Sequence, residues 1–174
     1  MRIGFNYLTM EVLKNAIWKE LEEVKDPEIP VISIIELGMI TGLDISDSNE
    51  VKIYMIPTFT ACPAIEVLKS AIKKQIVEKL QKFNFKSVTV ELTHDIAWSS
   101  NRITEKGKKI LKQFGLAPPP VHDGNIDLEM LEHTTCPYCD SNQTSMKSSF
   151  GSTLCRSIHY CNHCRQSFEQ FKPL

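Results

Sequence analysis

The chain has 174 residues, of which 42% are hydrophobic, and its 20 basic and 21 acidic residues give a formal net charge of -1 at pH 7. This length accommodates one ordinary hydrophobic core and a small appendage, so we expect two domains. The balanced charge argues against nucleic acid or an anionic membrane surface as a partner. No apolar run has the length of a membrane span, and residues 1–8 lack the pattern of a secretion signal, so we expect a cytoplasmic protein.

The first elements in chain order are a helix and two strands. Apolar side chains recur at helical spacing over residues 10–24, and Pro27 lies just beyond this amphipathic helix. A strand is expected over residues 39–45. Apolar and polar residues then alternate over 51–55, which predicts a returning strand after a turn at 47–49.

A strand-helix-strand crossover follows. The long helix is marked by a stripe of apolar residues at helical spacing, and Val88, Val90 and Leu92 alternate in a third strand, which should run parallel to the second. A last helix is expected from its cap, Thr104, to Gly115. The stripe consists of Ile65, Leu68, Ile72, Ile76 and Leu80.

These elements predict an α+β fold: a small mixed sheet with helices in the order α-β-β-α-β-α, followed by a C-terminal ribbon of short antiparallel strands. We expect the α/β domain to span residues 1–117. Three consecutive prolines begin a polar linker over 118–132, within which residues 128–131 favour a short helix. The ribbon occupies 133–174.

Two Cys-x-x-Cys pairs, 21 residues apart, are the strongest motif in the chain: Cys136 and Cys139, then Cys161 and Cys164. Four thiolates from two tight turns suit a tetrahedral zinc ion. So short a segment cannot bury a sufficient apolar core, so we expect a bound metal to stabilise its fold. A rubredoxin-like iron site and a redox pair are the alternatives. Two disulfides fit poorly with a reducing compartment.

Three further residues of the ribbon are potential ligands. Cys155 lies between the two pairs and is either an extra ligand or an ordinary buried thiol. His159 and His163 carry ligand nitrogens, but the spacing favours the four cysteines, which already complete a zinc shell.

Cys62 stands apart because it lies in a loop that leads directly into the long helix. The positive end of a helix dipole stabilises a thiolate, which can bind a metal or attack an electrophile. A small buried hydrophobe is the alternative interpretation. Asp26-Pro27-Glu28 and residues 98–102 are polar islands that fit loop caps equally well, and His94 and Asp95 end the third strand.

Four motifs in register resemble the iron-sulfur cluster assembly domain family, to which SufT-like proteins belong. They are Asp26 to Val31, Glu36 to Ile40, Pro57 to Pro63 and Ala97 to Ser99. The ribbon segments Phe150 to Cys155 and Phe168 to Lys172 narrow the resemblance to the PaaD (PaaJ) family of accessory subunits of the phenylacetyl-CoA oxygenase system.

This resemblance implies a non-catalytic accessory protein of aerobic phenylacetate breakdown that helps to assemble or maintain the metal cofactors of the oxygenase. It assigns Cys62 to the handling of a transient iron or iron-sulfur cluster, with Asp26 and Glu28 beside it. The partners it implies are oxygenase or reductase subunits, and self-association is left open. One position departs from the pattern: Asn101 stands where such proteins commonly show Asp, so it supplies no charged ligand but can still form hydrogen bonds.

Three rival functions remain open from the sequence. The first is a structural adaptor that holds oxygenase components together without binding a cluster. The second is a zinc ribbon that binds nucleic acid. The third is an enzyme in which Cys62 is the nucleophile and His94 the base. The ribbon lacks a dense basic face. No oxyanion-hole motif accompanies the Cys-His pair, so the enzyme ranks last.

Overall fold

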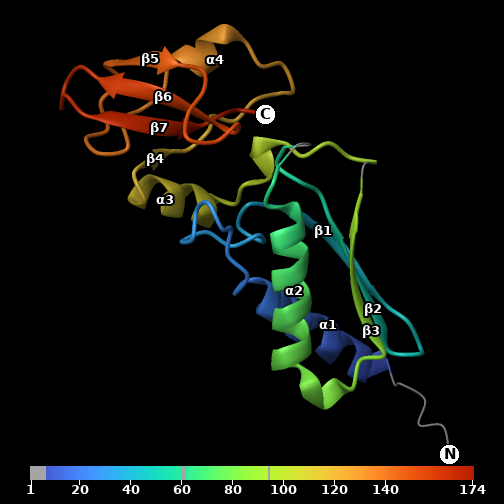
Figure 1. Ribbon diagram of the computed structural model, residues 1–174. Coiled ribbons are helices and arrows are strands. Elements are labelled where there is room, and N and C mark those ends of the chain that lie inside the picture. The colour runs from blue at the N-terminus through green and yellow to red at the C-terminus, as the bar shows by residue number, and fades with distance from the viewer. Residues whose placement is uncertain (1–6, 60–61, 94) are drawn as a thin grey trace, which may run out of the picture. The chain divides into compact units, whose positions relative to one another are not determined.

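The computed structural model describes residues 7–59, 62–93 and 95–174, and the chain divides into two compact units (Figure 1). The first comprises Met1–Pro57 and Pro63–Ala97, and the second Thr58–Cys62 and Trp98–Leu174. The elements follow the predicted α-β-β-α-β-α order and then form the strands of the ribbon, which confirms the α+β fold class. In the described part of the chain, no helix is both long and apolar enough for a membrane span.

The first unit is built on a three-stranded sheet in the order β1-β2-β3. Strands β1 (Ile40–Ile45) and β2 (Glu50–Met55) form an antiparallel hairpin, and β3 (Ser87–Leu92) lies parallel to β2. The helix α2 (Ile65–Lys79) connects β2 to β3, so the predicted crossover between parallel strands is confirmed. A short 3-10 helix, η1 (Gln81–Phe83), follows α2.

Two helices supply the core of this unit. The helices α1 (Tyr7–Leu21) and α2 contact one another, and each also contacts the sheet. Along β2, buried residues alternate with more exposed ones, which leaves one face of the sheet for the helices. The buried side chains that meet here are Leu13, Ile17 and Leu21 of α1, Leu68, Ile72 and Ile76 of α2, and Val51, Ile53 and Met55 of β2.

The second unit contains a four-stranded sheet in the order β4-β7-β6-β5. It is preceded by the 3-10 helix η2 (Ser100–Arg102) and the helix α3 (Glu105–Gln113), whose predicted cap is confirmed: the Thr104 hydroxyl accepts a hydrogen bond from the Gly107 N–H at 3.0 Å. The helix α4 (Leu128–Glu132) lies in the polar segment. The strands are β4 (Leu116–Ala117), β5 (Thr144–Ser148), β6 (Arg156–Cys161) and β7 (Ser167–Phe171).

The sequence did not indicate β4. This two-residue strand pairs in parallel with β7, Leu116 opposite Glu169, and it brings the chain from α3 to the edge of the ribbon sheet. Residues 98–117 therefore cluster with the ribbon, although the sequence assigned them to the first domain. The predicted domain ranges stay a prediction, because contacts within one chain do not test which segment folds alone.

Candidate metal centre and cysteine loop

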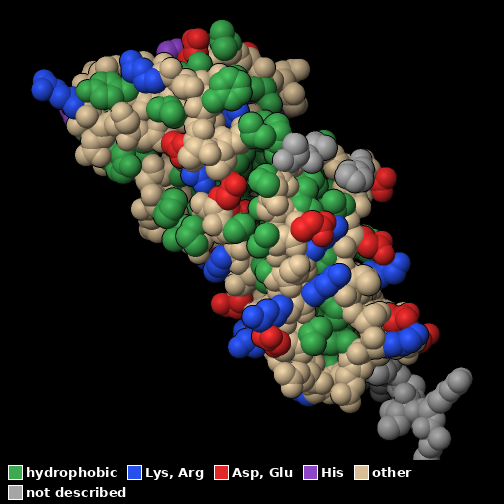
Figure 2. Space-filling model, in the orientation of Figure 1, with side chains coloured by type: hydrophobic (Ala, Val, Ile, Leu, Met, Phe, Trp, Pro, Cys, Tyr) green, Lys and Arg blue, Asp and Glu red, His purple; other side chains and the backbone are tan. Residues whose placement is uncertain are grey.

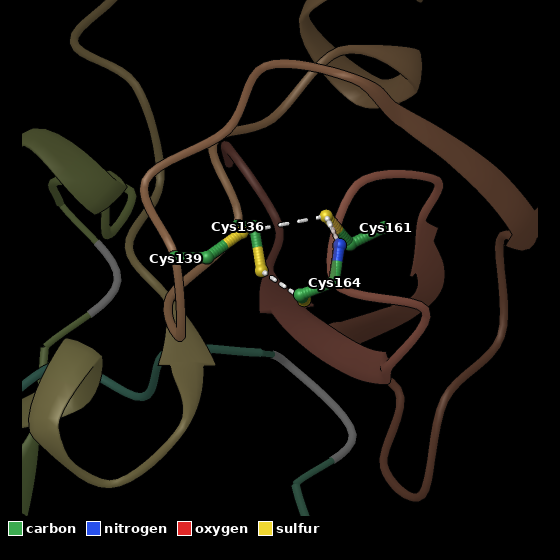
Figure 3. A group of neighbouring side chains, drawn as sticks. All are labelled: Cys136, Cys139, Cys161 and Cys164. Atoms are coloured by element: carbon green, nitrogen blue, oxygen red, sulfur yellow. Dashed lines mark hydrogen bonds between the residues drawn. The ribbon is translucent and has the colours of Figure 1, made fainter.

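Four cysteines of the ribbon point toward a common centre (Figure 3). Their four sulfurs all lie within 4.8 Å of one another. Cys136 Sγ is 3.6 Å from Cys164 Sγ, and Cys139 Sγ is 3.6 Å from Cys161 Sγ, so each close pair joins one Cys-x-x-Cys turn to the other.

These separations match a metal shell and not two disulfides. Metal–sulfur bonds of about 2.3 Å in a tetrahedron place neighbouring sulfurs about 3.8 Å apart. A disulfide would bring two sulfurs to about 2.05 Å. None of the four cysteines is in a disulfide, and their sulfurs lie close enough together to hold one metal ion.

The two Cys-x-x-Cys turns share one backbone pattern. The Asp140 N–H donates to the Cys136 carbonyl at 3.0 Å, and the Arg165 N–H donates to the Cys161 carbonyl at 2.9 Å. Asp140 and Arg165 also have similar positive φ angles, 58° and 61°. Two copies of the same tight turn thus present two sulfurs each to one point.

Backbone N–H groups prepare the sulfur of Cys161 for a metal. Burial alone would raise the pKa of this thiol, but N–H groups of Cys164 and His163 stabilise its thiolate and lower the pKa to about 6. The Cys164 N–H lies 3.5 Å from Cys161 Sγ. In contrast, burial raises the pKa of Cys164 to about 12 and also raises that of Cys136. A cation at the centre is the natural compensation for four clustered thiols.

The other potential ligands of the ribbon lie outside this group. Cys155 is half-buried, and its sulfur is 3.1 Å from the Thr153 hydroxyl. His159 is fully buried, stacks on Phe168, and has its Nε2 2.9 Å from the Ser157 hydroxyl. Burial lowers the pKa of His159 to about 4, so this ring is neutral at pH 7.

Cys62 is half-buried and lies three residues before the first residue of α2. Its N–H donates to the Phe59 carbonyl at 3.0 Å. Because Pro63 and Ala64 separate it from α2, Cys62 precedes the first helical turn instead of forming part of it. Thr60 and Ala61 of the same loop, and His94, lie outside the described residues, so the Cys62–His94 pair stays a prediction.

The Asp26 carboxylate holds its own loop together in the first unit. Its Oδ1 accepts hydrogen bonds from the Glu28 N–H at 2.8 Å and the Ile29 N–H at 2.9 Å. Nearby in the sequence, buried Ser33 and Glu36 cap each other: the Ser33 N–H donates to Glu36 Oε2 at 2.8 Å, and the Glu36 N–H donates to Ser33 Oγ at 3.1 Å. The metal-handling role of Asp26 and Glu28 stays a prediction.

Asn101 forms two hydrogen bonds with the backbone of His122. Its Nδ2 donates to the His122 carbonyl at 2.6 Å, and its Oδ1 accepts from the His122 N–H at 3.1 Å. The buried His122 ring also places Nε2 3.2 Å from the Ser100 hydroxyl and 3.1 Å from the Leu174 carbonyl. No local pattern indicated this cluster, because His122 is more than 20 positions along the chain from each of these partners.

Asn101→Asp is expected to destabilise the second unit by about 1–3 kcal/mol at pH 7. An ionised carboxylate only accepts hydrogen bonds, so it loses the bond to the His122 carbonyl and faces that oxygen with a negative charge. Urea denaturation measures the loss. Asn142→Asp is the matched control, because Asn142 uses its Oδ1 only to accept from the Thr135 hydroxyl, which Asp also does. Equal stability of the two variants would contradict this explanation.

Comparison with known proteins finds a matching family for each of the two parts of the chain. Residues 14–90 match the model of the iron-sulfur cluster assembly protein family, and residues 123–172 match that of the PaaD zinc beta ribbon domain. A protein of Escherichia coli (strain K12), described as a putative subunit of 1,2-phenylacetyl-CoA epoxidase, is 36% identical over 156 residues, which cover 90% of each chain.

Two further proteins match somewhat more than half of the chain. The "Fe-S protein maturation auxiliary factor YitW" of Bacillus subtilis (strain 168) is 26% identical over 98 residues, which are 56% of this chain and 92% of that protein. A crystal structure of a domain of unknown function, DUF59, from Bacillus anthracis has a TM-score of 0.56 and 25% identity, and the alignment covers 61% of this chain and 97% of that one.

The fold and the cysteine cluster thus define a class of protein that joins an iron-sulfur cluster assembly domain to a zinc ribbon. Within that class, the chain belongs to the PaaD family.

Proposed function

We propose that this chain is a non-catalytic accessory protein of aerobic phenylacetate breakdown, which supplies or maintains iron or iron-sulfur cofactors in a phenylacetyl-CoA oxygenase complex. The observation that carries the proposal is the 36% identity, over 90% of the chain, to a protein described as a putative subunit of 1,2-phenylacetyl-CoA epoxidase. The match of residues 14–90 to the iron-sulfur cluster assembly family supports the choice of cargo. Oxygenase or reductase subunits of that system are the proposed partners.

Zinc is the metal that we propose for the ribbon, with Cys136, Cys139, Cys161 and Cys164 as its ligands. Sulfur separations of 3.6 Å and a match to a zinc ribbon model support this choice. Four cysteines leave no open position for a substrate, so the ion would stabilise the fold and perform no chemistry.

Cys62 is the proposed residue for the cargo. Cys62 is only half-buried as a residue, in contrast to the fully buried Cys136 and Cys161. A thiolate is a good iron ligand, and a single one from this chain leaves the remaining positions to the client, which favours handover. The participation of Asp26 and Glu28 is a proposal from the family resemblance alone.

Cys62→Ala is expected to weaken iron binding at least about tenfold, because even the loss of an outer-shell partner typically costs about 10–100-fold in metal affinity. Iron and sulfide are titrated into the anaerobic protein, and transfer is followed as iron per client subunit. Cys155→Ser is the matched control, since Cys155 is likewise half-buried and outside the quartet. A Cys62→Ala protein that binds and transfers iron as well as the parent would refute the role of Cys62.

A second measurement separates maturation from a purely structural role. Oxygenase and reductase subunits are produced with and without this chain, and both their iron content and their assembly are determined. The proposal expects subunits made without the chain to assemble but lack iron. Subunits that contain full iron but fail to assemble would identify the chain as an adaptor.

A further inference from the structure

The loop between β5 and β6, residues 149–155, exposes two large apolar side chains. Phe150 is 68% exposed and Leu154 is 48% exposed, whereas Phe168 and Phe171 of the β6–β7 hairpin are buried. We call residues 149–155 the tip loop. An exposed aromatic and an exposed leucine side chain, four positions apart in one short loop, are candidates for contact with a partner protein.

Hydrogen bonds hold the tip loop in one conformation. Ser152 donates to the Glu169 carboxylate through its N–H at 2.5 Å and its hydroxyl at 3.0 Å, while Arg156 donates to the same carboxylate at 3.0 Å. At its base, the Gly151 N–H donates to the Arg156 carbonyl at 2.9 Å. These bonds lower the pKa of Glu169 in spite of its burial, so the carboxylate is ionised at pH 7.

Gly151 is required by this packing. A Cβ at residue 151 would lie 2.7 Å from Glu169 Oε1 and 2.9 Å from Arg156 Cβ, closer than side-chain atoms tolerate. The loop is therefore tied tightly to β6 and β7, although its two large side chains contribute little to the core. A loop that is already ordered loses little conformational entropy on binding, which favours affinity.

One basic side chain, Lys172, lies beside Phe150, and the segment that contains the tip loop has a net positive charge. Lys172 donates to the Ser149 carbonyl at 3.3 Å, and its Nζ lies 5.8 Å from the centre of the Phe150 ring. Residues 144–174 contain four basic residues (Lys147, Arg156, Arg165 and Lys172) and one acidic residue, Glu169, a net charge of +3 by that count, in a chain whose net charge is -1. That one acidic residue is already paired with Arg156.

We infer that the tip loop is a docking site for a protein surface with an apolar pocket bordered by aspartate and glutamate side chains. Phe150 and Leu154 would fill the pocket, and Lys147 and Lys172 would face its acidic border. This inference depends on the proposed function for the identity of the partner, which is an oxygenase or reductase subunit. Figure 2 shows both green hydrophobic and blue basic side chains on the visible surface of the second unit, at the upper left of the view.

Binding of each purified subunit of the oxygenase system to the full-length, metal-loaded protein tests the inference. Phe150→Ala/Leu154→Ala should weaken binding at least about thirtyfold, the effect expected when central apolar anchors are truncated. Val121→Ala, which truncates an equally exposed residue (69%), should stay within about twofold of the parent. Lys147→Glu and added salt should slow association, because complementary charge acts mainly on the encounter rate.

The outcomes separate this inference from the proposed function. Undiminished binding by Phe150→Ala/Leu154→Ala would overturn the docking site alone, whereas the iron content of the client tests the maturation role independently. If the parent binds none of the subunits, the proposed occupant is wrong whatever the iron content shows. If truncation instead dissociates a dimer in analytical ultracentrifugation, the occupant is a second copy and the inference is likewise overturned. Unchanged zinc content and circular dichroism establish that each variant is folded.

Discussion

Cys161→Ser is expected to abolish metal binding and to unfold the ribbon. Cys161 is fully buried and its sulfur faces that of Cys139 across the centre of the cluster. Structural zinc contributes about 10–16 kcal/mol to small zinc modules, as much as the total stability of a typical domain, about 5–15 kcal/mol. A serine hydroxyl at this position is a poor ligand, and it leaves a polar group buried among Ala117, Cys136 and Phe168.

Metal analysis and thermal denaturation measure this effect. The parent should contain one equivalent of zinc and the Cys161→Ser protein essentially none, with loss of the unfolding transition of the ribbon. A strong chelator should produce the same change in the parent, and zinc should reverse it. Cys155→Ser serves as the control, since its sulfur contacts Thr153 and lies outside the quartet. Retention of one zinc and of the parent's melting temperature in Cys161→Ser would exclude the four-cysteine site.

The quartet was predictable because its ligands come from two short motifs. Each Cys-x-x-Cys pair sets the separation of its own two sulfurs, so only one long-range event, the approach of the two turns, has to be inferred. The hairpin of β6 and β7 carries the second turn, and the first turn lies between α4 and β5. The sequence contained almost all of this information.

The regular elements of the first unit were also predictable from the sequence, because the hydrophobic pattern repeats over the whole length of each helix or strand. The stripe of α2 covers four turns, and the alternation of β2 covers the whole strand. The two residues of β4 have no period at all, and their pairing is decided by the partner strand β7. Short strands of this kind follow from tertiary contacts that a local pattern does not contain.

Cys62 illustrates a different limit. A lone cysteine has no spacing from which to infer a ligand set, so its chemistry depends on exposure and neighbours. The structure shows Cys62 as a half-buried residue in a loop, and its cargo-binding role stays a prediction. The hydrogen bonds of Asn101 could not be inferred from the sequence either, because its partner His122 is 21 positions away and belongs to no motif.

Ile72→Ala is expected to destabilise the first unit by about 2–5 kcal/mol. Ile72 is fully buried near the middle of α2, and its truncation leaves a cavity in the closely packed core between the helices and the sheet. Val77→Ala on the same helix removes an apolar side chain that is 49% exposed, and it should change stability by less than about 0.5 kcal/mol. Denaturant unfolding followed by far-UV circular dichroism compares the two.

The zinc content distinguishes a loss of packing in the first unit from global unfolding. Because all four ligands belong to the second unit, Ile72→Ala should retain one zinc while its first unit melts at lower temperature. Equal destabilisation by Ile72→Ala and Val77→Ala would mean that burial along α2 is assigned incorrectly. Loss of zinc in Ile72→Ala would mean that the ribbon depends on the first unit for its own stability, and the two units would then behave as one cooperative fold.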